Sequence, residues 1–349
     1  MKKMIQPEAL KVGANRISAN DARSVKLDFA PMEGITGYVF RQAHAVIYGG
    51  VDRYYSPFIA PGSSHKLTSR ERNDILPEHN QGMEVIPQIL TSDPEDFLDT
   101  AVKLKEYGYT EVNLNLGCPS GTVAAKGKGA GFLKDTEKLA RFLGEVSEGM
   151  ERENLHFSIK TRVGVESEEE FQTLLGLYNQ CPLTELIIHP RVLKDFYKYN
   201  VRMNAFKEGF EKSRHSVCYN GDIFRRKDYD RLVKEYPDLD KIMMGRGIMM
   251  NPFLMEEIAD GTSQKVSGKM SADRKADRLE KFHRLLCDGY THVMSGDRPV
   301  LFKMKELWGF LIHSCPEEEK LMKKIRKAQH LAEYEGVVSE LFCRMREHE

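Results

Sequence analysis

Eight short runs rich in β-branched and other apolar residues recur along the first two thirds of the chain, with helix-like stretches between them. The runs cover residues 26–30, 51–56, 84–90, 111–116, 156–161, 185–189, 216–220 and 241–245. Strands that alternate with helices pair in parallel, and eight such units close into a barrel. We therefore predict an α/β fold built on a (β/α)8 TIM barrel. An open doubly wound sheet is the alternative, but the early G-x-G-x-x-G typical of that fold is missing.

The clearest predicted helix covers residues 94–107. Asp93 can cap its first turn, Pro94 suits the first helical position, and Gly108 follows its end. The same apolar periodicity predicts helices over residues 134–149, 168–178, 226–236 and 252–259.

Residues 260–272 are polar, rich in Gly and Ser and without apolar periodicity, which is typical of a linker. Beyond them, helices are predicted over residues 273–294 and 300–313, and a third begins at Pro316, where three glutamates follow the proline. We divide the chain into an N-terminal extension (1–24), a barrel domain (25–260) and a small all-helical C-terminal domain (270–349).

Net charge gives no argument for a polyanionic partner, because 52 Lys and Arg balance 52 Asp and Glu among the 349 residues. The 41% hydrophobic content excludes disorder of the bulk. Positive charge gathers in the last predicted helix, at Lys320, Lys323, Lys324, Arg326 and Lys327. These five residues, the basic cluster, form either a solvated, ion-paired helix face or a surface for a polyanion.

No stretch approaches the roughly 18 apolar residues that cross a bilayer, and the first residues lack the apolar segment of a secretory signal. The six cysteines lie far apart without a C-x-x-C pair, which argues against a structural zinc site or a disulfide framework. We expect a cytoplasmic protein with reduced thiols, no metal and no membrane contact. We also expect it to be a monomer.

Polar and glycine-rich residues gather where the predicted strands end, whereas the strand interiors are largely Val, Ile, Leu and Met. Active-site groups of such barrels project from the carboxyl ends of the strands. This segregation predicts an enzyme, with its candidate site residues at Pro31, Met32, Gln88, Asn115, Cys118, Lys160, Arg162, His189, Arg191, Asn220, Gly221, Asp222, Gly245 and Arg246.

The last two strand ends predict a phosphate site. They read Asn-Gly-Asp at residues 220–222 and Gly-Arg-Gly at 245–247. Phosphate sites commonly form in these loops because glycines let backbone N–H groups approach the anion. Two tight turns are the alternative, but the charge of Arg246 favours a phosphate-bearing ligand.

Lys160 ends the fifth strand, where a buried ammonium needs an electron-rich partner. It is either a Schiff-base lysine or a fixed cation facing a flavin ring. Arg162 shares its strand face, and His189 and Arg191 repeat the spacing one strand later. His189 is either a structural residue or a ligand contact.

Cys118 follows the fourth strand, and glycines at 121, 127, 129 and 131 predict a mobile loop after it. A thiol on such a loop can act as a nucleophile or as a general acid. No His–Asp relay for a hydrolytic triad is recognisable in the sequence. The alternative is a small buried hydrophobic residue.

Ordered motifs across residues 26–254 resemble the dihydrouridine synthases: APMEGITGYVFR, PQIL, NLNLGCPSGTV, IKTRVG, IIHPR, YNGDI and MMGRGIMMNPFL. The N-x-G-C-P element is the most specific of them. Members of this family are FMN-dependent enzymes that reduce uridine in RNA, mostly tRNA, with NADPH. Their architecture, a flavin barrel followed by a helical RNA-binding domain, is similar to the division predicted above.

The resemblance implies a role for each site residue. Cys118 would protonate C5 of the uracil while hydride passes from flavin N5 to C6. The FMN contacts would come from Pro31, Met32, Gln88, Asn115, Lys160, His189, Asn220, Gly221, Asp222, Gly245 and Arg246. The RNA contacts would come from Arg162, Arg191, Lys320, Lys323, Lys324, Arg326 and Lys327.

Two residues depart from the family pattern. Gly37 follows Thr36 where the family usually has an Asp, and Thr122 precedes Val123 where a basic residue is common. Three alternatives stay open: an FMN barrel acting on a free small molecule, a dihydrouridine synthase acting on ribosomal RNA, and, if the two departures mark lost function, a non-catalytic RNA-binding relative. The helical C-terminal domain argues against the first. The intact Cys118 argues against the last.

Overall fold

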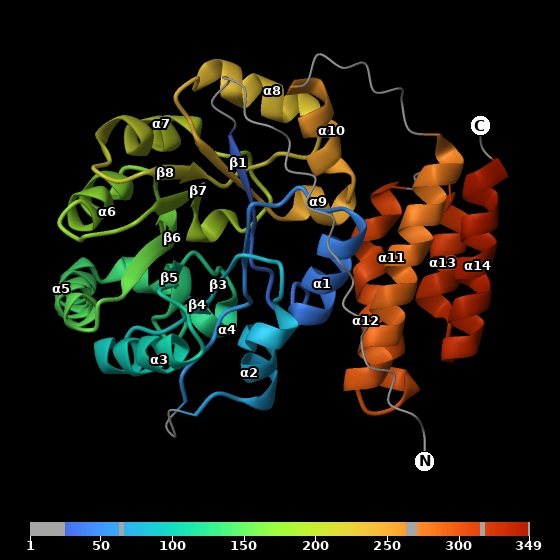
Figure 1. The fold of residues 1–349 in the computed structure, drawn as a ribbon. Coiled ribbons are helices and arrows are strands. Elements are labelled where there is room, and N and C mark those ends of the chain that lie inside the picture. The colour runs from blue at the N-terminus through green and yellow to red at the C-terminus, as the bar shows by residue number, and fades with distance from the viewer. Residues whose placement is uncertain (1–24, 63–65, 263–270, 315–317, 348–349) are drawn as a thin grey trace.

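The molecule is a barrel of parallel strands with a bundle of helices packed against one side (Figure 1). This computed structural model describes residues 25–62, 66–262, 271–314 and 318–347. The barrel runs from blue to gold in Figure 1, and the C-terminal helices are orange to red. The predicted N-terminal extension, residues 1–24, lies outside the described residues.

Nine parallel strands follow the order β3-β2-β1-β9-β8-β7-β6-β5-β4. Their bounds are β1 (Lys26–Phe29), β2 (Arg53–Tyr55), β3 (Val85–Ile86), β4 (Gln88–Ile89), β5 (Glu111–Leu116), β6 (His156–Gly164), β7 (Leu186–Val192), β8 (Val217–Tyr219) and β9 (Lys241–Met244). β3 and β4 are the two halves of one predicted strand, divided at Pro87, which has no N–H to donate. The first strand pairs with the last, so the predicted eight-stranded barrel is confirmed and the open sheet is excluded.

Helices cover the outside of the barrel (Figure 1). Their bounds are α1 (Tyr38–Ile47), α2 (Ser69–Ile75), α3 (Pro94–Glu106), α5 (Thr136–Arg152), α6 (Glu170–Tyr178), α7 (Met203–Lys212), α8 (Arg226–Glu235) and α10 (Leu254–Thr262). The predicted cap of α3 is present, because the Asp93 carboxylate accepts the N–H of Asp96 at 3.0 Å. The sequence did not predict α1, α2 or α7.

Short helical turns join several of these elements. They are α4 (Gly121–Ala124), α9 (Arg246–Met250) and the 3₁₀ turns η1 (Pro77–His79), η2 (Gly129–Lys134), η3 (Leu193–Asp195) and η4 (Ile312–Ser314). Three of them, α4, η3 and α9, follow β5, β7 and β9 at the carboxyl end of the barrel, where the backbone folds back towards the next helix.

Four C-terminal helices form the bundle: α11 (Ala272–Val293), α12 (Asp297–Leu311), α13 (Glu319–Lys327) and α14 (Leu331–Glu347). Trp308 is buried at its centre and donates its indole N–H to the Tyr334 hydroxyl at 2.8 Å. His283 Nε2 lies 2.6 Å from the same hydroxyl. The first three residues of the predicted linker complete α10, while residues 263–270 and the predicted helix start at Pro316 lie outside the described residues.

The bundle packs on the barrel through α11 and α1. Phe40 and Phe282 meet edge to face with ring centroids 5.5 Å apart. Gly289 lets the helices approach, since a Cβ there would lie 2.6 Å from Val39. Bundle and barrel therefore share one apolar core. Within the described ranges, no helix has both the length and the apolar character needed to cross a bilayer.

A buried ion network fills the barrel where β2, β7 and β9 begin. One Arg53 nitrogen lies 2.6 Å from Asp28 and 2.9 Å from Glu185, and Lys241 lies 2.8 Å from Glu185. Glu185, Asp28 and Cys218 have ligand atoms close enough to hold a metal ion. Two cations already balance the two carboxylates, so the geometry fits an internal ion-pair network.

Candidate active site

Parallel pairing brings the predicted site residues to one end of the barrel, because each follows or ends a strand. Met32, after β1, meets the loop after β9: a Cβ on Gly245 would lie 3.7 Å from the Met32 sulfur. The ends of β5, β6, β7 and β8 complete the same mouth through paired neighbours. The structure therefore places these residues around one end of the barrel, and their roles stay predictions.

A chain of buried amides supports the wall between β4 and β6. Gln88 donates to Asn113 at 2.7 Å and accepts from Asn115 at 2.6 Å, and Asn113 donates to the Ser158 hydroxyl at 2.9 Å. Asn113 and Ser158 are wholly buried, and sequence reasoning missed both. The polar alternation of Asn113 and Asn115 on an otherwise apolar strand was the available signal.

Asn115 fixes the backbone beside the cysteine. Its side-chain oxygen accepts the N–H groups of Gly117 at 3.0 Å and Cys118 at 2.9 Å. Both polar atoms of its amide are thus used within the protein. Burial raises the pKa of the half-buried Cys118 thiol above its ordinary value, although a backbone hydrogen bond from Ser120 opposes this. The thiol therefore keeps its proton at neutral pH, as a general acid requires.

The predicted mobile loop after Cys118 is instead two helical turns, α4 and η2. Glycine is required there for close packing. A Cβ on Gly129 would lie 2.9 Å from the Cys118 carbonyl oxygen, and one on Gly131 would lie 2.4 Å from the Ala124 carbonyl oxygen. Gly129 and Gly131 therefore mark close backbone contact, and the mobility of this segment stays a prediction.

Lys160 projects into the mouth from β6. Burial, and next the positive charge of Arg162, lower the pKa of its ammonium to about 8. No residue in the described part of the chain hydrogen-bonds to Lys160 Nζ. A half-buried cation without a protein partner is ready to meet an electron-rich ligand.

His189 is held in the neutral form. Burial, and then the charges of Arg162 and Lys160, lower its pKa well below the ordinary value. Its Nδ1 lies 2.5 Å from the Asn220 carbonyl oxygen, so Nδ1 carries the proton and Nε2 is an acceptor. The Asn220 amide donates to the Met243 carbonyl oxygen at 2.8 Å. Asn220 therefore couples β7, β8 and β9.

The two predicted phosphate loops meet at Asp222. Its carboxylate accepts from Arg191 at 3.0 Å and from Arg246 at 2.7 Å. A Cβ on Gly221 would collide with the Tyr219 hydroxyl, 2.0 Å away, so only glycine fits there. Two guanidinium groups against one carboxylate leave a net positive charge at this point.

Arg162 and Arg191 were predicted to contact RNA, but their nitrogens are used inside the protein. Arg162 is fully buried and donates to the carbonyl oxygens of Gly117 at 3.0 Å, Val192 at 2.8 Å and Phe196 at 2.9 Å. Arg191 is also buried and donates to Asp222 and to the Tyr199 carbonyl oxygen at 2.7 Å. This geometry favours a positioning role for both. Sequence reasoning missed the loop that they hold.

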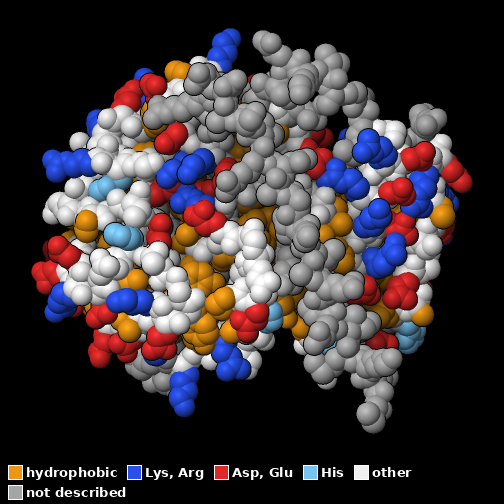
Figure 2. Space-filling view, viewed as in Figure 1, with side chains coloured by type: hydrophobic (Ala, Val, Ile, Leu, Met, Phe, Trp, Pro, Cys, Tyr) orange, Lys and Arg blue, Asp and Glu red, His pale blue; other side chains and the backbone are white. Residues whose placement is uncertain are grey.

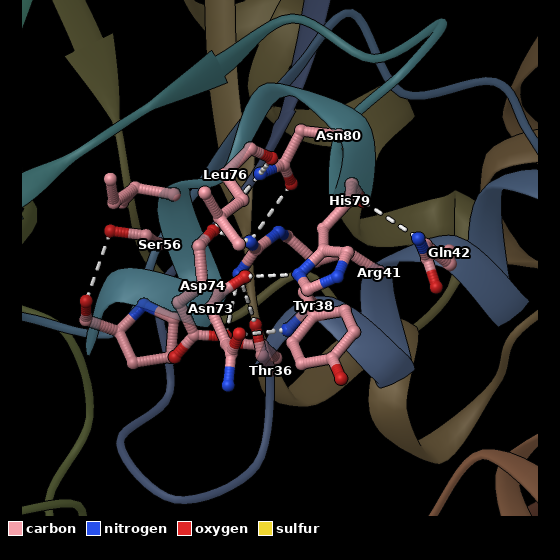
Figure 3. A network of polar contacts seen from close by, with 12 residues as sticks. Thr36, Tyr38, Arg41, Gln42, Ser56, Asn73, Asp74, Leu76, His79 and Asn80 are labelled. Atoms are coloured by element: carbon pink, nitrogen blue, oxygen red, sulfur yellow. Dashed lines mark hydrogen bonds and ion pairs between the residues drawn. The ribbon is translucent and has the colours of Figure 1, made fainter. Parts of the chain in front are cut away.

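At Gly37, where the family usually has an Asp, the carboxylate beside the start of α1 comes from Asp74 (Figure 3). Asp74, from α2, accepts the Tyr38 N–H at the start of α1 at 2.6 Å, and its oxygen lies 3.1 Å from the position of a Cβ on Gly37. Arg41 donates to the Asp74 and Thr36 carbonyl oxygens beneath it. An acidic group thus caps α1 from a neighbouring helix.

The basic cluster lies exposed on α13. Basic and acidic side chains are interspersed over the visible face of the bundle (Figure 2). Lys323 pairs with Glu319 at 3.1 Å and Lys324 with Glu340 at 3.2 Å. Lys320, Arg326 and Lys327 have no ion-pair partner among the described residues. Part of the cluster is therefore an ion-paired face, and part is open to a polyanion.

By fold the chain is a TIM barrel, and solved structures of other enzymes share this fold. It superposes on the old yellow enzyme homologue from Zymomonas mobilis with a TM-score of 0.50 and 11% identity, covering 69% of this chain and 90% of that one. Histamine dehydrogenase from Rhizobium sp. 4-9 superposes with a TM-score of 0.52 and 11% identity, and the match covers 76% of this chain and 48% of that one. At such low identity the likeness concerns the fold alone.

The chain belongs to the dihydrouridine synthase family, whose model, described as Dihydrouridine synthase (Dus), matches residues 28–342. Relatives include a probable tRNA-dihydrouridine synthase from Staphylococcus aureus (strain COL), 30% identical over 65% of this chain and 70% of the relative. A second probable tRNA-dihydrouridine synthase, from Staphylococcus epidermidis (strain ATCC 12228 / FDA PCI 1200), is 29% identical over 73% of this chain and 79% of the relative. The predicted family and the prediction of an oxidoreductase are thereby confirmed.

Proposed function

We propose that this chain reduces uridine to 5,6-dihydrouridine in tRNA, with FMN as resident cofactor and NADPH as reductant. Both relatives described above are named as probable tRNA-dihydrouridine synthases, which supports the tRNA substrate. The observation that carries the proposal is Cys118, a protonated thiol whose backbone is fixed by Asn115 at the mouth of the barrel. Cys118 would deliver its proton to C5 of the uracil.

The residues at the mouth fit FMN. Lys160 offers an unpartnered ammonium that can meet the electron-rich edge of the ring, next to the amides of Gln88 and Asn115. Pro31 and Met32 would back the ring, and the loops of Gly221, Asp222, Gly245 and Arg246, with His189 and Asn220, would enclose ribityl and phosphate. When bound and reduced, FMN supplies the hydride that is added to C6.

The reaction needs uridine outside its base stack, since the cysteine lies within a barrel mouth. We assign residues 270–349 as the RNA-binding domain. Their described helices are α11 to α14, and Lys303 of α12 donates to the carbonyl oxygen of Gly34, which follows β1 at the mouth. The exposed and unpaired members of the basic cluster support this assignment, because phosphate contacts supply most non-specific RNA affinity.

The function is tested by measuring dihydrouridine at each position of tRNA and ribosomal RNA from a strain that lacks the gene. We expect loss at a defined tRNA position and its recovery when the purified yellow protein, NADPH and that tRNA are combined. Loss in ribosomal RNA alone would contradict the tRNA assignment. An unchanged modification map in both RNAs, together with no activity on purified tRNA, would reject the function.

Affinity of the cofactor-free chain for FMN should fall as the pH rises above about 8. The pKa of Lys160 is lowered to about 8, so its cation is present below that pH and is lost above it. Titration of FMN by fluorescence quenching across neutral and alkaline pH measures this. Lys160→Arg keeps its charge throughout this range and should move the fall to higher pH. An identical fall in both proteins would contradict the contact between Lys160 and flavin.

Replacing Lys320 and Lys327 with Gln should weaken tRNA binding and flatten its salt dependence. Each lost phosphate contact should reduce the slope of log K against log salt by roughly 0.7–0.9. Lys207→Gln with Lys212→Gln on α7 is the matched control, because these exposed lysines pair with neighbouring glutamates away from the bundle. Equal curves for the two double variants would show that the cluster is only a solvated face.

A further inference from the structure

Three exposed aromatic residues lie within four positions of one another in sequence, on the connection between β7 and α7. Phe196, Tyr197 and Tyr199 expose 45%, 52% and 62% of their surfaces. No other exposed large apolar residues in the described ranges lie so close together in sequence. Grouped rings in water mark an interaction site more often than a packing accident. We call residues 193–202 the aromatic loop.

The aromatic loop is fixed at the mouth of the barrel. Arg162 holds the Phe196 carbonyl oxygen and also that of Gly117, the residue before Cys118. Arg191 holds the Tyr199 carbonyl oxygen. The loop and the cysteine segment are thus tied to one buried guanidinium, so the rings keep a defined position relative to the thiol.

The backbone of Phe196 is held in an unusual conformation. Its φ of +48° is rare for a residue with a side chain and persists only where the surroundings over-determine it. Such a conformation at an exposed ring indicates that the placement of the ring has a use.

Cations accompany the rings. The Arg246 guanidinium lies 4.4 Å from the centre of the Tyr197 ring, and that of Arg162 lies 5.3 Å from it. Lys198, between Tyr197 and Tyr199, is exposed and has no ion-pair partner among the described residues. Aromatic rings interleaved with cations are typical of surfaces for single-stranded nucleic acid, where bases stack and cations meet phosphates.

We propose that Phe196 and Tyr199 form a stacking platform for an unpaired base of the substrate RNA, next to the uridine that enters the barrel. The inference rests on the proposed function and names how the RNA is held at the same site. A uridine that leaves its stack also deprives its neighbour of a stacking partner. A ring at the mouth replaces that partner and keeps the strand open.

The test uses the full-length, flavin-loaded chain and two probes, a single-stranded oligouridylate and an RNA duplex of equal length. The variant Phe196→Leu with Tyr199→Leu should bind the single strand about tenfold or more weakly, since one base–ring stack contributes about 1–3 kcal/mol. Its affinity for the duplex should change little. Tyr199→Phe keeps the ring and should lose much less than Tyr199→Leu. Val46→Ala, an exposed apolar change at the far end of α1, is the surface control.

Unchanged affinity for the single strand, or an equal loss for both probes, would overturn the stacking platform. A variant that keeps its flavin absorbance is folded, so a change in its RNA affinity is not caused by unfolding. If the double variant loses its flavin, the single variant Tyr199→Leu is measured in its place. Failure of the proposed function is recognised differently, because the wild-type chain would then form no dihydrouridine in tRNA whatever the platform variants bind.

Discussion

Replacing Cys118 with Ala should lower dihydrouridine formation in tRNA by roughly 10²- to 10⁴-fold while FMN stays bound. That range is the usual contribution of a positioned general acid. Burial raises the pKa of the thiol, so the proton is present at neutral pH and is offered where Asn115 fixes the Cys118 backbone. Alanine removes the proton and leaves the hydrogen bond from the residue 118 N–H to Asn115 intact.

The measurement combines mass spectrometry of tRNA with flavin absorbance and with reduction of the flavin by NADPH. Only tRNA turnover should fall, since the thiol acts on the uracil and not on the reductant. Cys343→Ala is the matched control, because Cys343 is an exposed cysteine on α14. Full turnover by Cys118→Ala would reject the general acid, and loss of flavin from that variant would assign Cys118 to cofactor binding.

The barrel could be predicted from sequence because the pattern that indicates each strand lies within a few consecutive residues. Each buried parallel strand is a short apolar run, and the run at residues 111–116 matches β5 residue for residue. The third strand shows the limit of this reasoning. Its apolar run is continuous, but Pro87 divides the ladder into β3 and β4, and only pairing with strands on both sides reveals the division.

The location of the site could also be predicted, since parallel strands send all their carboxyl ends to one mouth. The partners of the side chains could not. Arg162 donates to the carbonyl oxygens of Val192 and Phe196, which lie 30 and 34 residues along the chain. Arg191 donates to the Tyr199 carbonyl oxygen and to the Asp222 carboxylate, 8 and 31 residues away, and no sequence pattern indicates these pairings. Asp74 likewise caps α1 from a distance of 36 residues, which no local motif records.

The glycines after Cys118 show that one residue type can indicate either mobility or close backbone contact. Gly129 and Gly131 lie against the backbone of Cys118 and Ala124, so a missing side chain there means close contact. Local composition cannot separate the two causes, because both favour the same residue. The contact between the cysteine segment and η2 shows the second cause at Gly129 and Gly131.

Replacing Arg53 with Met should lower the free energy of unfolding by about 3–5 kcal/mol, the usual result of breaking a buried ion pair. Arg53 lies 2.6 Å from Asp28 and 2.9 Å from Glu185, and both carboxylates are fully buried. Methionine fills most of the volume but leaves two carboxylates facing one lysine, Lys241. Urea unfolding followed by circular dichroism measures the change.

Lys105→Met is the matched control, since Lys105 forms an exposed ion pair with Glu153 and its loss should cost about 0–1 kcal/mol. The pKa of Asp28 is already raised by burial to about 6. Arg53 lowers that pKa, so its removal should raise the pKa of Asp28 further above 6. Protonation of Asp28 then removes the buried charge, so the deficit of Arg53→Met should be largest at alkaline pH, shrink as the pH falls towards about 6 and level off below that value. Equal costs for the two variants, or a deficit independent of pH, would mean that the network stabilises the barrel by packing and not by paired charge.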